Sequence, residues 1–132
     1  MTRKGIVKKL DTLFSLYIRK RYAVDGIAEC FTCGKKDHVS RLHAGHFQSR
    51  KHMATRFDEE NCQVQCIKCN IFDSGQQYIF SLRLDEKYGE GTAEELEFLA
   101  RTIHKVSRVE YEEQISYYKN LVENLKEEKG IQ

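Results

Sequence analysis

Two short cysteine motifs, Cys30-Phe-Thr-Cys33 and Cys66-Ile-Lys-Cys69, decide the fold predicted for this chain. Each is a Cys-x-x-Cys pair, and its two thiolates match the bite of a tetrahedral zinc ion with Zn–S distances of about 2.3 Å. Two such pairs complete a four-ligand shell, which is typical of a structural site and leaves no position open for a substrate. The sequence therefore predicts one structural Zn²⁺ bound by Cys30, Cys33, Cys66 and Cys69.

Disulfide bonds are the alternative use of these cysteines. The chain has five cysteines, an odd number, and no apolar signal-peptide core follows its basic N-terminus. Both features argue against a secreted, oxidised protein and favour metal-bound thiolates. Cys62 is left over, and we expect it to be a small buried hydrophobe.

Size and composition favour one globular domain, predicted to span residues 1–132. The chain has a mass of 15.5 kDa and a mean hydropathy of −0.63. Its apolar runs fall far short of the roughly 20 residues that a membrane-spanning helix needs, so no membrane association is expected. Seven Phe, seven Tyr and the lack of a low-complexity tract exclude wholesale disorder.

Helices are predicted at both ends of the chain. Apolar residues recur at helical spacing across residues 4–22, which predicts an N-terminal helix. Thr92-Ala-Glu-Glu95 and Ser107-Arg-Val-Glu110 have the pattern of capping boxes, and they predict C-terminal helices across residues 92–128.

The zinc core is predicted to lie between these helices, across residues 28–90. Residues 62–66 alternate in polarity and predict a brief strand that enters the second cysteine motif. After Cys69 a helical pattern begins, is interrupted at Ser74-Gly75, and then continues to a stop at Tyr88-Gly89.

The last predicted helix has a narrow apolar seam with heptad spacing, formed by Tyr111, Ile115, Tyr118, Val122 and Leu125. Such a seam can pair with a second copy of the chain, which would give a homodimer through the C-terminal helix. It can equally lie against the N-terminal helix of the same chain, and the sequence leaves both options open.

The segment between the two cysteine motifs carries the candidate chemistry. It contains Leu42-His43-Ala44-Gly45-His46-Phe47, followed by Asn61 fifteen residues after His46 and by Asn70 nine residues later. This order resembles the ββα-metal unit of HNH (His-Me finger) nucleases, in which a general-base histidine, a central Asn and a final His or Asn ligand follow one another. Cys-x-x-Cys motifs frequently flank that unit.

A narrower resemblance is to the phage recombination nucleases of the NinG/Rap family. It rests on Ala44-Gly45-His46-Phe47, on Thr55-Arg56-Phe57-Asp58-Glu59-Glu60-Asn61, and on Gln65-Cys66-x-x-Cys69-Asn70 with Ser74-Gly75. The resemblance covers residues 10–90 and is most specific in its middle third. It implies a metal-dependent DNA endonuclease from a phage or prophage recombination system, acting on branched DNA in the cytoplasm of a bacterial host.

The resemblance also implies catalytic roles. His46 would be the general base, because a neutral imidazole with a pKa of about 6.5 accepts a proton near pH 7. Asn61 would hold the loop and the imidazole of the base in register. Asn70 would donate an oxygen to one Mg²⁺ or Mn²⁺ ion, which stabilises the leaving oxyanion. Many HNH enzymes place a second ligand directly before the base, but Gly45 stands there and cannot ligate, so His43 is the nearest substitute.

Each of these residues also has a plain structural interpretation. Asn70 follows the second cysteine motif as Gly34 follows the first, and both residue types readily take the left-handed conformation that such turns favour. Asn61 would serve as a cap or turn residue, and His46 as a structural histidine. His43 faces away from His46 on a regular strand, so its use as a ligand requires a bulge at the glycine.

Charge is divided unevenly along the chain. Residues 1–56 hold thirteen Lys and Arg against four Asp and Glu, whereas residues 57–132 hold nine against sixteen. A basic half suggests a polyanionic partner such as DNA, although an ordinary solvated surface is the alternative. Arg50, Lys51 and Arg56 follow His46 closely, and they are predicted to grip phosphates beside the cut. Arg56 is favoured because the resemblance includes it.

Taken together, the sequence predicts a small α+β domain, with a zinc-stapled ββα-metal core and helices at both ends. The expected function is metal-dependent cleavage of DNA. Two alternatives remain from other classes, a zinc-ribbon DNA-binding module without catalysis and a protein-interaction adaptor that uses the acidic helices.

Overall fold

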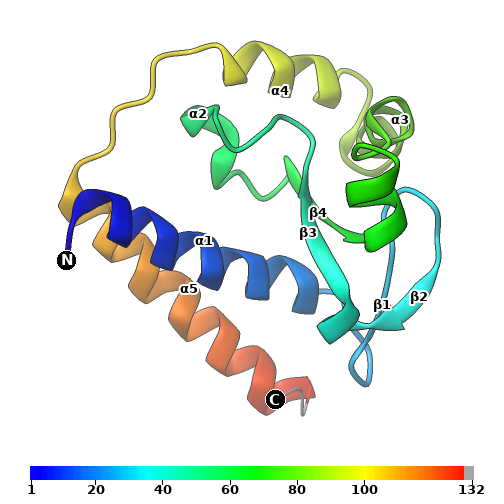
Figure 1. Ribbon diagram of the computed structural model, residues 1–132, viewed down its shortest axis with the longest axis horizontal. Helices are drawn as coiled ribbons and strands as arrows, with labels where there is room; N and C mark the ends of the chain where they lie inside the picture. Colours follow the sequence, from blue (N-terminus) through cyan, green and yellow to red (C-terminus); the bar gives the residue numbers. More distant parts are fainter. Residues whose placement is uncertain (130–132) are drawn as a thin grey trace.

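The computed structural model describes residues 1–129 and forms a mixed α+β domain (Figure 1). The three remaining residues of the predicted domain lie outside the described residues. In chain order the elements are α1 (Arg3–Lys20), β1 (Ile27–Glu29), β2 (Lys36–His38), the 3₁₀ turn η1 (Val39–Arg41), β3 (Leu42–His46), α2 (Met53–Arg56), β4 (Cys62–Cys66), the π-helical turn η2 (Lys68–Phe72), α3 (Gln77–Tyr88), α4 (Thr92–Ala100) and α5 (Arg108–Lys129). None of the described helices is both long and apolar enough to cross a membrane.

The strands form two separate antiparallel pairs, β1 with β2 and β3 with β4. In the second pair the register runs without interruption from Leu42 opposite Cys66 to His46 opposite Cys62. The strand predicted over residues 62–66 is confirmed as β4. The bulge that His43 was expected to require is absent, because every residue of β3 has one partner in β4.

The two terminal helices lie side by side, with α1 against the β3–β4 pair and α5 on the other side of α1 (Figure 1). The N-terminal helix predicted over 4–22 is confirmed as α1, and its buried residues recur every four positions as Ile6, Leu10, Phe14 and Ile18. These side chains share one apolar cluster with residues of α5 and with Cys62, which is fully buried as expected.

The apolar seam of α5 is used within the chain. Tyr111, Tyr118 and Val122 are buried, and the ring of Tyr118 meets the edge of Phe14 in α1 at a centroid distance of 5.1 Å. The seam therefore lies against the N-terminal helix, the second of its two predicted options. A homodimer stays a prediction, and it would need another surface.

Only one of the two predicted capping boxes has the expected geometry. Ser107 precedes α5, and its hydroxyl accepts a hydrogen bond from the Glu110 backbone N–H at 3.1 Å. The prediction for Thr92 was wrong, because Gly91 occupies the cap position and Thr92 instead donates its hydroxyl hydrogen to the Gly89 carbonyl. The carboxylate of Asp85 in α3 accepts from the Ala93 N–H. A side chain from a neighbouring helix therefore caps the start of α4, in place of Thr92.

The predicted interruption after the second cysteine motif is confirmed. Ser74, Gly75 and Gln76 all have positive φ, at 52°, 87° and 51°. Three consecutive left-handed residues turn the chain between η2 and α3, because regular right-handed helix cannot pass through them. The predicted stop at Tyr88-Gly89 is also confirmed, with Gly89 at φ 116° as the C-cap of α3.

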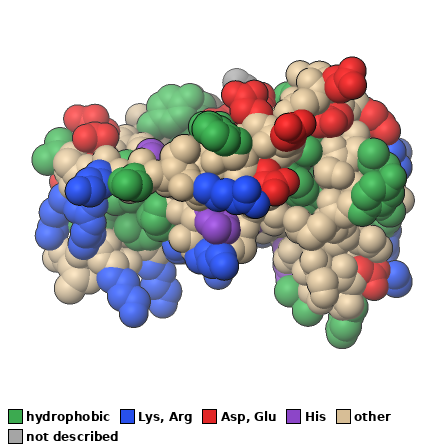
Figure 2. Space-filling model, turned by 90° about the horizontal axis from the view of Figure 1, so that it is seen from above, with side chains coloured by type: hydrophobic (Ala, Val, Ile, Leu, Met, Phe, Trp, Pro, Cys, Tyr) green, Lys and Arg blue, Asp and Glu red, His purple; other side chains and the backbone are tan. Residues whose placement is uncertain are grey.

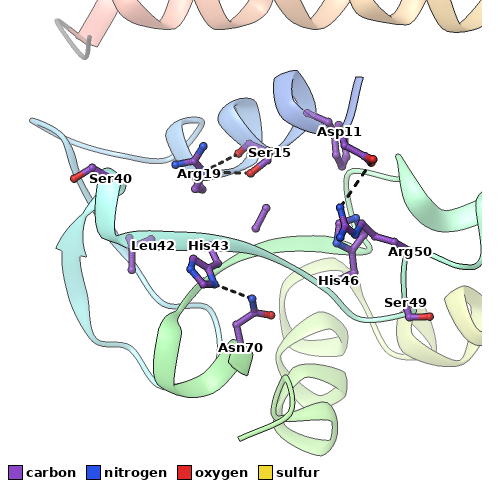
Figure 3. Close-up of a pocket in the computed structure, with 12 residues that line it drawn as sticks. Asp11, Ser15, Arg19, Ser40, Leu42, His43, His46, Ser49, Arg50 and Asn70 are labelled. Atoms are coloured by element: carbon purple, nitrogen blue, oxygen red, sulfur yellow. Dashed lines mark hydrogen bonds and ion pairs between the residues drawn. The ribbon is translucent and has the colours of Figure 1, made fainter. Parts of the chain in front are cut away.

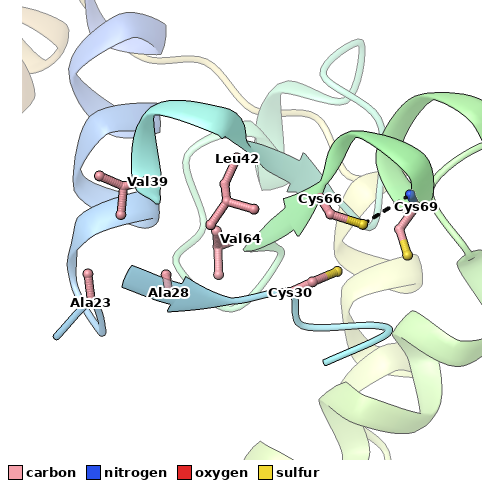
Figure 4. Close-up of a cluster of buried hydrophobic side chains, with 8 residues drawn as sticks. All are labelled: Ala23, Ala28, Cys30, Val39, Leu42, Val64, Cys66 and Cys69. Atoms are coloured by element: carbon pink, nitrogen blue, oxygen red, sulfur yellow. Dashed lines mark hydrogen bonds between the residues drawn. The ribbon is translucent and has the colours of Figure 1, made fainter. Parts of the chain in front are cut away.

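The four motif cysteines converge at the point where β4 ends, and Figure 4 shows three of them, Cys30, Cys66 and Cys69. Their Sγ atoms all lie within 4.8 Å of one another, and those of Cys33 and Cys66 are 3.7 Å apart. A tetrahedral ion with bonds of about 2.3 Å sets its sulfur atoms about 3.8 Å apart, so this cluster fits zinc. All the cysteines are free thiols, and the disulfide alternative is therefore not adopted.

Backbone geometry supports the metal interpretation of the cluster. Gly34 has φ +80° as expected, and its N–H donates to the Cys30 carbonyl at 2.9 Å. Burial would raise the pKa of the Cys30 thiol, but hydrogen bonds from the Thr32 hydroxyl and nearby backbone N–H groups lower it to about 6. The Cys69 N–H points to the Cys66 sulfur at 3.5 Å. Donors aimed at sulfur thus favour the thiolate form at Cys30, whereas burial raises the pKa of the Cys33 and Cys69 thiols in the cluster without a metal.

Asn70 does not match the glycine that follows the first motif. It lies inside η2 and has no positive φ, so the prediction of a left-handed turn residue was wrong at this position. The turn is made four residues later, from Ser74 onward. The Asn70 side chain is consequently not explained by backbone conformation.

A glutamine side chain occupies the space beside Gly45. An added Cβ at Gly45 would lie 1.8 Å from Oε1 of Gln65, which is fully buried. The Gln65 amide donates to the Thr32 hydroxyl at 3.1 Å and to the Gly75 carbonyl at 2.9 Å. Gln65 thus joins β4 to the first cysteine motif and to the turn that precedes α3, and only a glycine at position 45 leaves room for it.

The cysteine cluster leads to a prediction about zinc. The purified protein should hold one zinc ion per chain, and Cys66→Ser should lose the ion together with much of the thermal stability. The reason is that structural zinc sites in peptides contribute roughly 10–16 kcal/mol of apparent binding free energy, which is folding free energy in a small domain. Elemental analysis and thermal melting give the two readouts. Cys62→Ala is the matched control, since Cys62 is buried outside the cluster, and equal zinc loss in both variants would contradict the assignment.

The packing at Gly45 leads to a second prediction. Gly45→Ala should destabilise the fold by about 1–3 kcal/mol, the usual cost of overpacking a core. Chemical denaturation measures the change, and Gln65→Ala in the same chain should remove most of it because the clash partner is then gone. Gly5→Ala serves as the control, because an added Cβ at Gly5 in α1 would meet Met1 and Thr2 and not Gln65, so Gln65→Ala should leave its effect unchanged. Additive effects of Gly45→Ala and Gln65→Ala would refute the contact.

Candidate active site

A cleft of about 580 Å³ runs along the free edge of β3, between α1 and the loop that follows the strand (Figure 3). Asp11, Arg50 and His46 lie toward one end, and His43 and Asn70 lie toward the other (Figure 3). The remaining lining residues are Phe14, Ser15, Arg19, Ser40, Leu42, Ala44 and Ser49.

His46 lies at the end of β3 with its imidazole half-buried. Its Nε2 is 3.0 Å from the Arg56 carbonyl oxygen. A carbonyl only accepts, so Nε2 carries the hydrogen and Nδ1 keeps its lone pair. Burial lowers the pKa of His46 from its ordinary value of 6.5, and the hydrogen bond to Arg56 offsets this only in part. The neutral ring is therefore the dominant form near pH 7, with one nitrogen ready to accept a proton.

Asn61 holds the loop that contacts His46. Its side chain is fully buried, accepts from the Gln48 N–H at 2.8 Å, and donates to the carbonyls of Gln48 and Thr55, both at 3.0 Å. Thr55 directly precedes Arg56, whose carbonyl accepts from the imidazole. The geometry is that of a clamp on the loop from Gln48 to Arg56, and Asn61 does not itself line the cleft.

His43 and Asn70 meet at the other end of the cleft. The His43 Nδ1 and the Asn70 Nδ2 are 3.0 Å apart. His43 faces away from His46 on the regular strand, yet both line the cleft, because β3 is an edge strand and the cleft follows its open side. No bulge at Gly45 brings His43 to the face of His46; His43 instead contacts Asn70 on its own face of the strand, and its role as a metal ligand stays a prediction.

This pair contains two kinds of uncharged metal donor, the Asn70 amide oxygen and an imidazole nitrogen of His43. In the structure the Asn70 Nδ2–H donates to the lone pair of His43 Nδ1, so binding of an ion by both residues requires the Asn70 amide to turn. An ion bound there would take most of its ligands from water and from phosphate oxygens. Within residues 1–129, the cysteine cluster is the only group of three or more Cys, His, Asp or Glu side chains close enough to surround an ion.

The three predicted phosphate-binding residues have different surroundings. Arg50 and Lys51 are exposed beside the cleft. The Arg56 guanidinium instead forms a paired contact with the Asp11 carboxylate, with Nε 2.9 Å from Oδ1 and the second nitrogen on Oδ2. Asp11 holds the pKa of Arg56 above its usual value. Arg56 is thus engaged inside the protein, whereas the exposed Arg50 guanidinium reaches the same Asp11 carboxylate only at 3.9 Å and is the more accessible of the two.

Sequence reasoning missed three residues of this site. Asp11, Ser15 and Arg19 line the cleft from one face of α1, four residues apart. That polar i, i+4 spacing within an apolar helix was the signal that could have identified them. Gln65 was missed as well. Its Oε1 is buried and has no hydrogen-bond partner, and it lies on the same face of the hairpin as His43, its cross-strand partner.

The chain resembles known phage proteins. It is 29% identical over 92 residues to "Protein ninG" of Salmonella phage P22, which covers 69% of this chain and 43% of the relative. It is 28% identical over 92 residues to "Protein ninG" of Escherichia phage 933W and of Enterobacteria phage VT2-Sa, covering 69% of this chain and 44% of each. The chain thus spans less than half the length of these curated relatives.

No solved structure matches the chain. A family model, in contrast, matches more of the chain than the pairwise alignments do. The family described as "Bacteriophage Lambda NinG protein" matches residues 2–128, which include both cysteine motifs, the cleft and the terminal helices. The chain therefore belongs to the NinG family of phage proteins.

Proposed function

We propose that this protein is a metal-dependent DNA endonuclease of the HNH type, which hydrolyses phosphodiester bonds of branched DNA in the cytoplasm of a phage-infected cell. The observation that carries the proposal is the geometry of His46. A backbone carbonyl fixes its Nε2–H, burial keeps the ring neutral, and Nδ1 is left free. A general base needs this combination, because it must hold a fixed tautomer and accept a proton near pH 7.

The residues of the cleft divide the reaction between them. Nδ1 of His46 takes a proton from the attacking water, and Asn61 positions the base through the loop that ends at Arg56. Arg50 binds the phosphate beside the cut. His43 and Asn70 would hold a divalent ion such as Mg²⁺ or Mn²⁺, which supplies stabilisation of the leaving oxygen when bound.

A DNA-binding zinc module without catalysis is the second candidate, and one observation favours it. The place directly before the base, where many HNH enzymes carry a metal ligand, is Gly45, and the Gln65 side chain fills the adjoining space. Only His43 and Asn70 then remain as protein ligands for a catalytic ion. DNA cleavage separates this candidate from the first, because both predict DNA binding.

Cleavage of DNA is the direct test of the proposal. Plasmid and four-way-junction DNA should be cut when Mg²⁺ or Mn²⁺ is added to the zinc-loaded protein, and not when zinc alone is present. His46→Ala should lower the rate by about 10²–10⁴-fold, the usual contribution of a general base. Asn70→Ala should be nearly as damaging, and Asn61→Ala should lower both activity and stability because it leaves buried carbonyls unpaired.

His52→Ala is the matched control for the base. It removes an imidazole from the same loop, but the His52 side chain caps nothing and lies outside the cleft. Its activity should equal that of the unaltered protein. Full activity of His46→Ala would refute the base, whereas DNA binding without any cleavage would favour the non-catalytic module.

The pH dependence of cleavage gives an independent prediction. Since burial lowers the pKa of His46, the neutral imidazole persists below pH 6.5, and it is lost only when the pH falls through the lowered value. The acid limb of kcat/KM should therefore have its midpoint below 6.5, where an ordinary histidine is already half protonated. A rate profile over mildly acidic to neutral pH measures it. A midpoint above 6.5 would show that another group, or a charged His46, controls the reaction.

A homodimer acting on two opposing strands belongs to the same proposal, because a two-fold dimer matches the symmetry of a four-way junction. The α5 seam is occupied by α1, so the second copy would have to bind elsewhere. Light scattering of the protein with and without junction DNA distinguishes the 15.5 kDa monomer from a dimer.

A further inference from the structure

A second groove, of about 880 Å³, adjoins the cleft between the first half of α1, α2 and the segment that precedes α5. It is strongly basic. The cationic side chains that line it are Arg3, Lys4, Lys8, Arg50, Lys51 and Arg56. The excess of positive charge in the first 56 residues is thus largely concentrated along one groove.

Most of this charge has no counter-ion within residues 1–129. One carboxylate, Asp11, lines the groove, and it binds Arg56 and lies 3.9 Å from the Arg50 guanidinium. Lys4, Lys8 and Lys51 are exposed, and none of them forms an ion pair within residues 1–129. Cations left without a counter-ion beside one another favour a bound polyanion.

The groove and the cleft are continuous, since Asp11 and Arg50 line both. Figure 2, which views the molecule from above Figure 1, shows Lys and Arg side chains over the left end and the centre of this face, with Asp and Glu mainly along its upper edge and right side. A linear polyanion that passes Arg50 in the cleft would therefore continue over α1.

We propose that this groove binds the sugar–phosphate backbone of the DNA that flanks the cleaved bond, with Lys4 and Lys8 of α1 as its main contacts. The inference rests on the proposed function, because a strand seated for cleavage at His46 extends into the groove. Lys4 and Lys8 are four residues apart on one face of α1, and each can contact a phosphate. The N-terminal helix thus becomes part of the DNA-binding surface, outside the nuclease motif itself.

The test measures binding separately from cleavage. Lys4→Ala and Lys8→Ala are introduced together into the His46→Ala protein, which holds DNA without cutting it, and fluorescence anisotropy follows a labelled duplex as salt is varied. The double variant should bind at least about tenfold more weakly at low salt, and its log–log salt slope should fall by about 2, because each lysine contributes one phosphate contact.

A variant with Lys9→Ala and Lys119→Ala is the matched control. It removes the same charge from exposed helix positions that do not line the groove, and it should bind nearly as the parent does. Equal weakening in both variants would attribute binding to net charge and overturn the proposal, as would unchanged binding in the Lys4/Lys8 variant. If the unaltered protein cuts no DNA while only the Lys4/Lys8 variant loses binding, the proposed function fails and the groove stands. An acidic polypeptide that binds as tightly as DNA would overturn the choice of ligand.

Discussion

The pairing register of β3 and β4 is the constraint on which the candidate site depends. Side chains alternate across a strand, so a slip by one residue would exchange the faces of His43 and His46. Two anchors hold the register at opposite ends of β4. Cys66 is tied into the sulfur cluster at one end, and Asn61, directly before the strand, is clamped by its buried amide at the other. The cysteine cluster at one end and the hydrogen bonds of Asn61 at the other thus fix the β3–β4 hairpin, and the cleft runs along the free edge of β3.

What the sequence could predict was local. The two Cys-x-x-Cys motifs, the α1 and β4 boundaries and the stop at Gly89 depend on spacing or on backbone conformation, and these predictions were confirmed. The misses depended on tertiary contacts. Thr92 has the sequence of a cap, but Asp85 from another helix satisfies the Ala93 N–H. The contact between His43 and Asn70 was likewise not predictable, because the two residues are distant in sequence and meet only in the folded chain.

The alternating polarity of residues 62–66 correctly predicted a strand, but it did not indicate that both faces of this strand are buried. Gln63 and Gln65 occupy the positions that would face solvent on a surface strand, yet both are buried. Gln63 is bonded to Arg21 and Tyr88, and the amide nitrogen of Gln65 is bonded to Thr32 of the first cysteine motif and to the Gly75 carbonyl. Buried polar groups that are paired specify one arrangement of the chain, since any other leaves them unsatisfied. No spacing rule identifies such partners, because they come from separate elements.

Asp11 links the N-terminal helix α1 to His46 through Arg56. Its carboxylate binds the Arg56 guanidinium, and the backbone carbonyl of the same arginine accepts from His46. The contact neutralises the one acidic side chain of the basic groove, and it also fixes the residue that orients the imidazole. In the proposed reaction, Arg56 would therefore contribute without touching a phosphate. Under the same proposals α1 would have two roles, since Asp11 holds the loop that contacts His46 and its lysines would face the DNA along the same side of the helix.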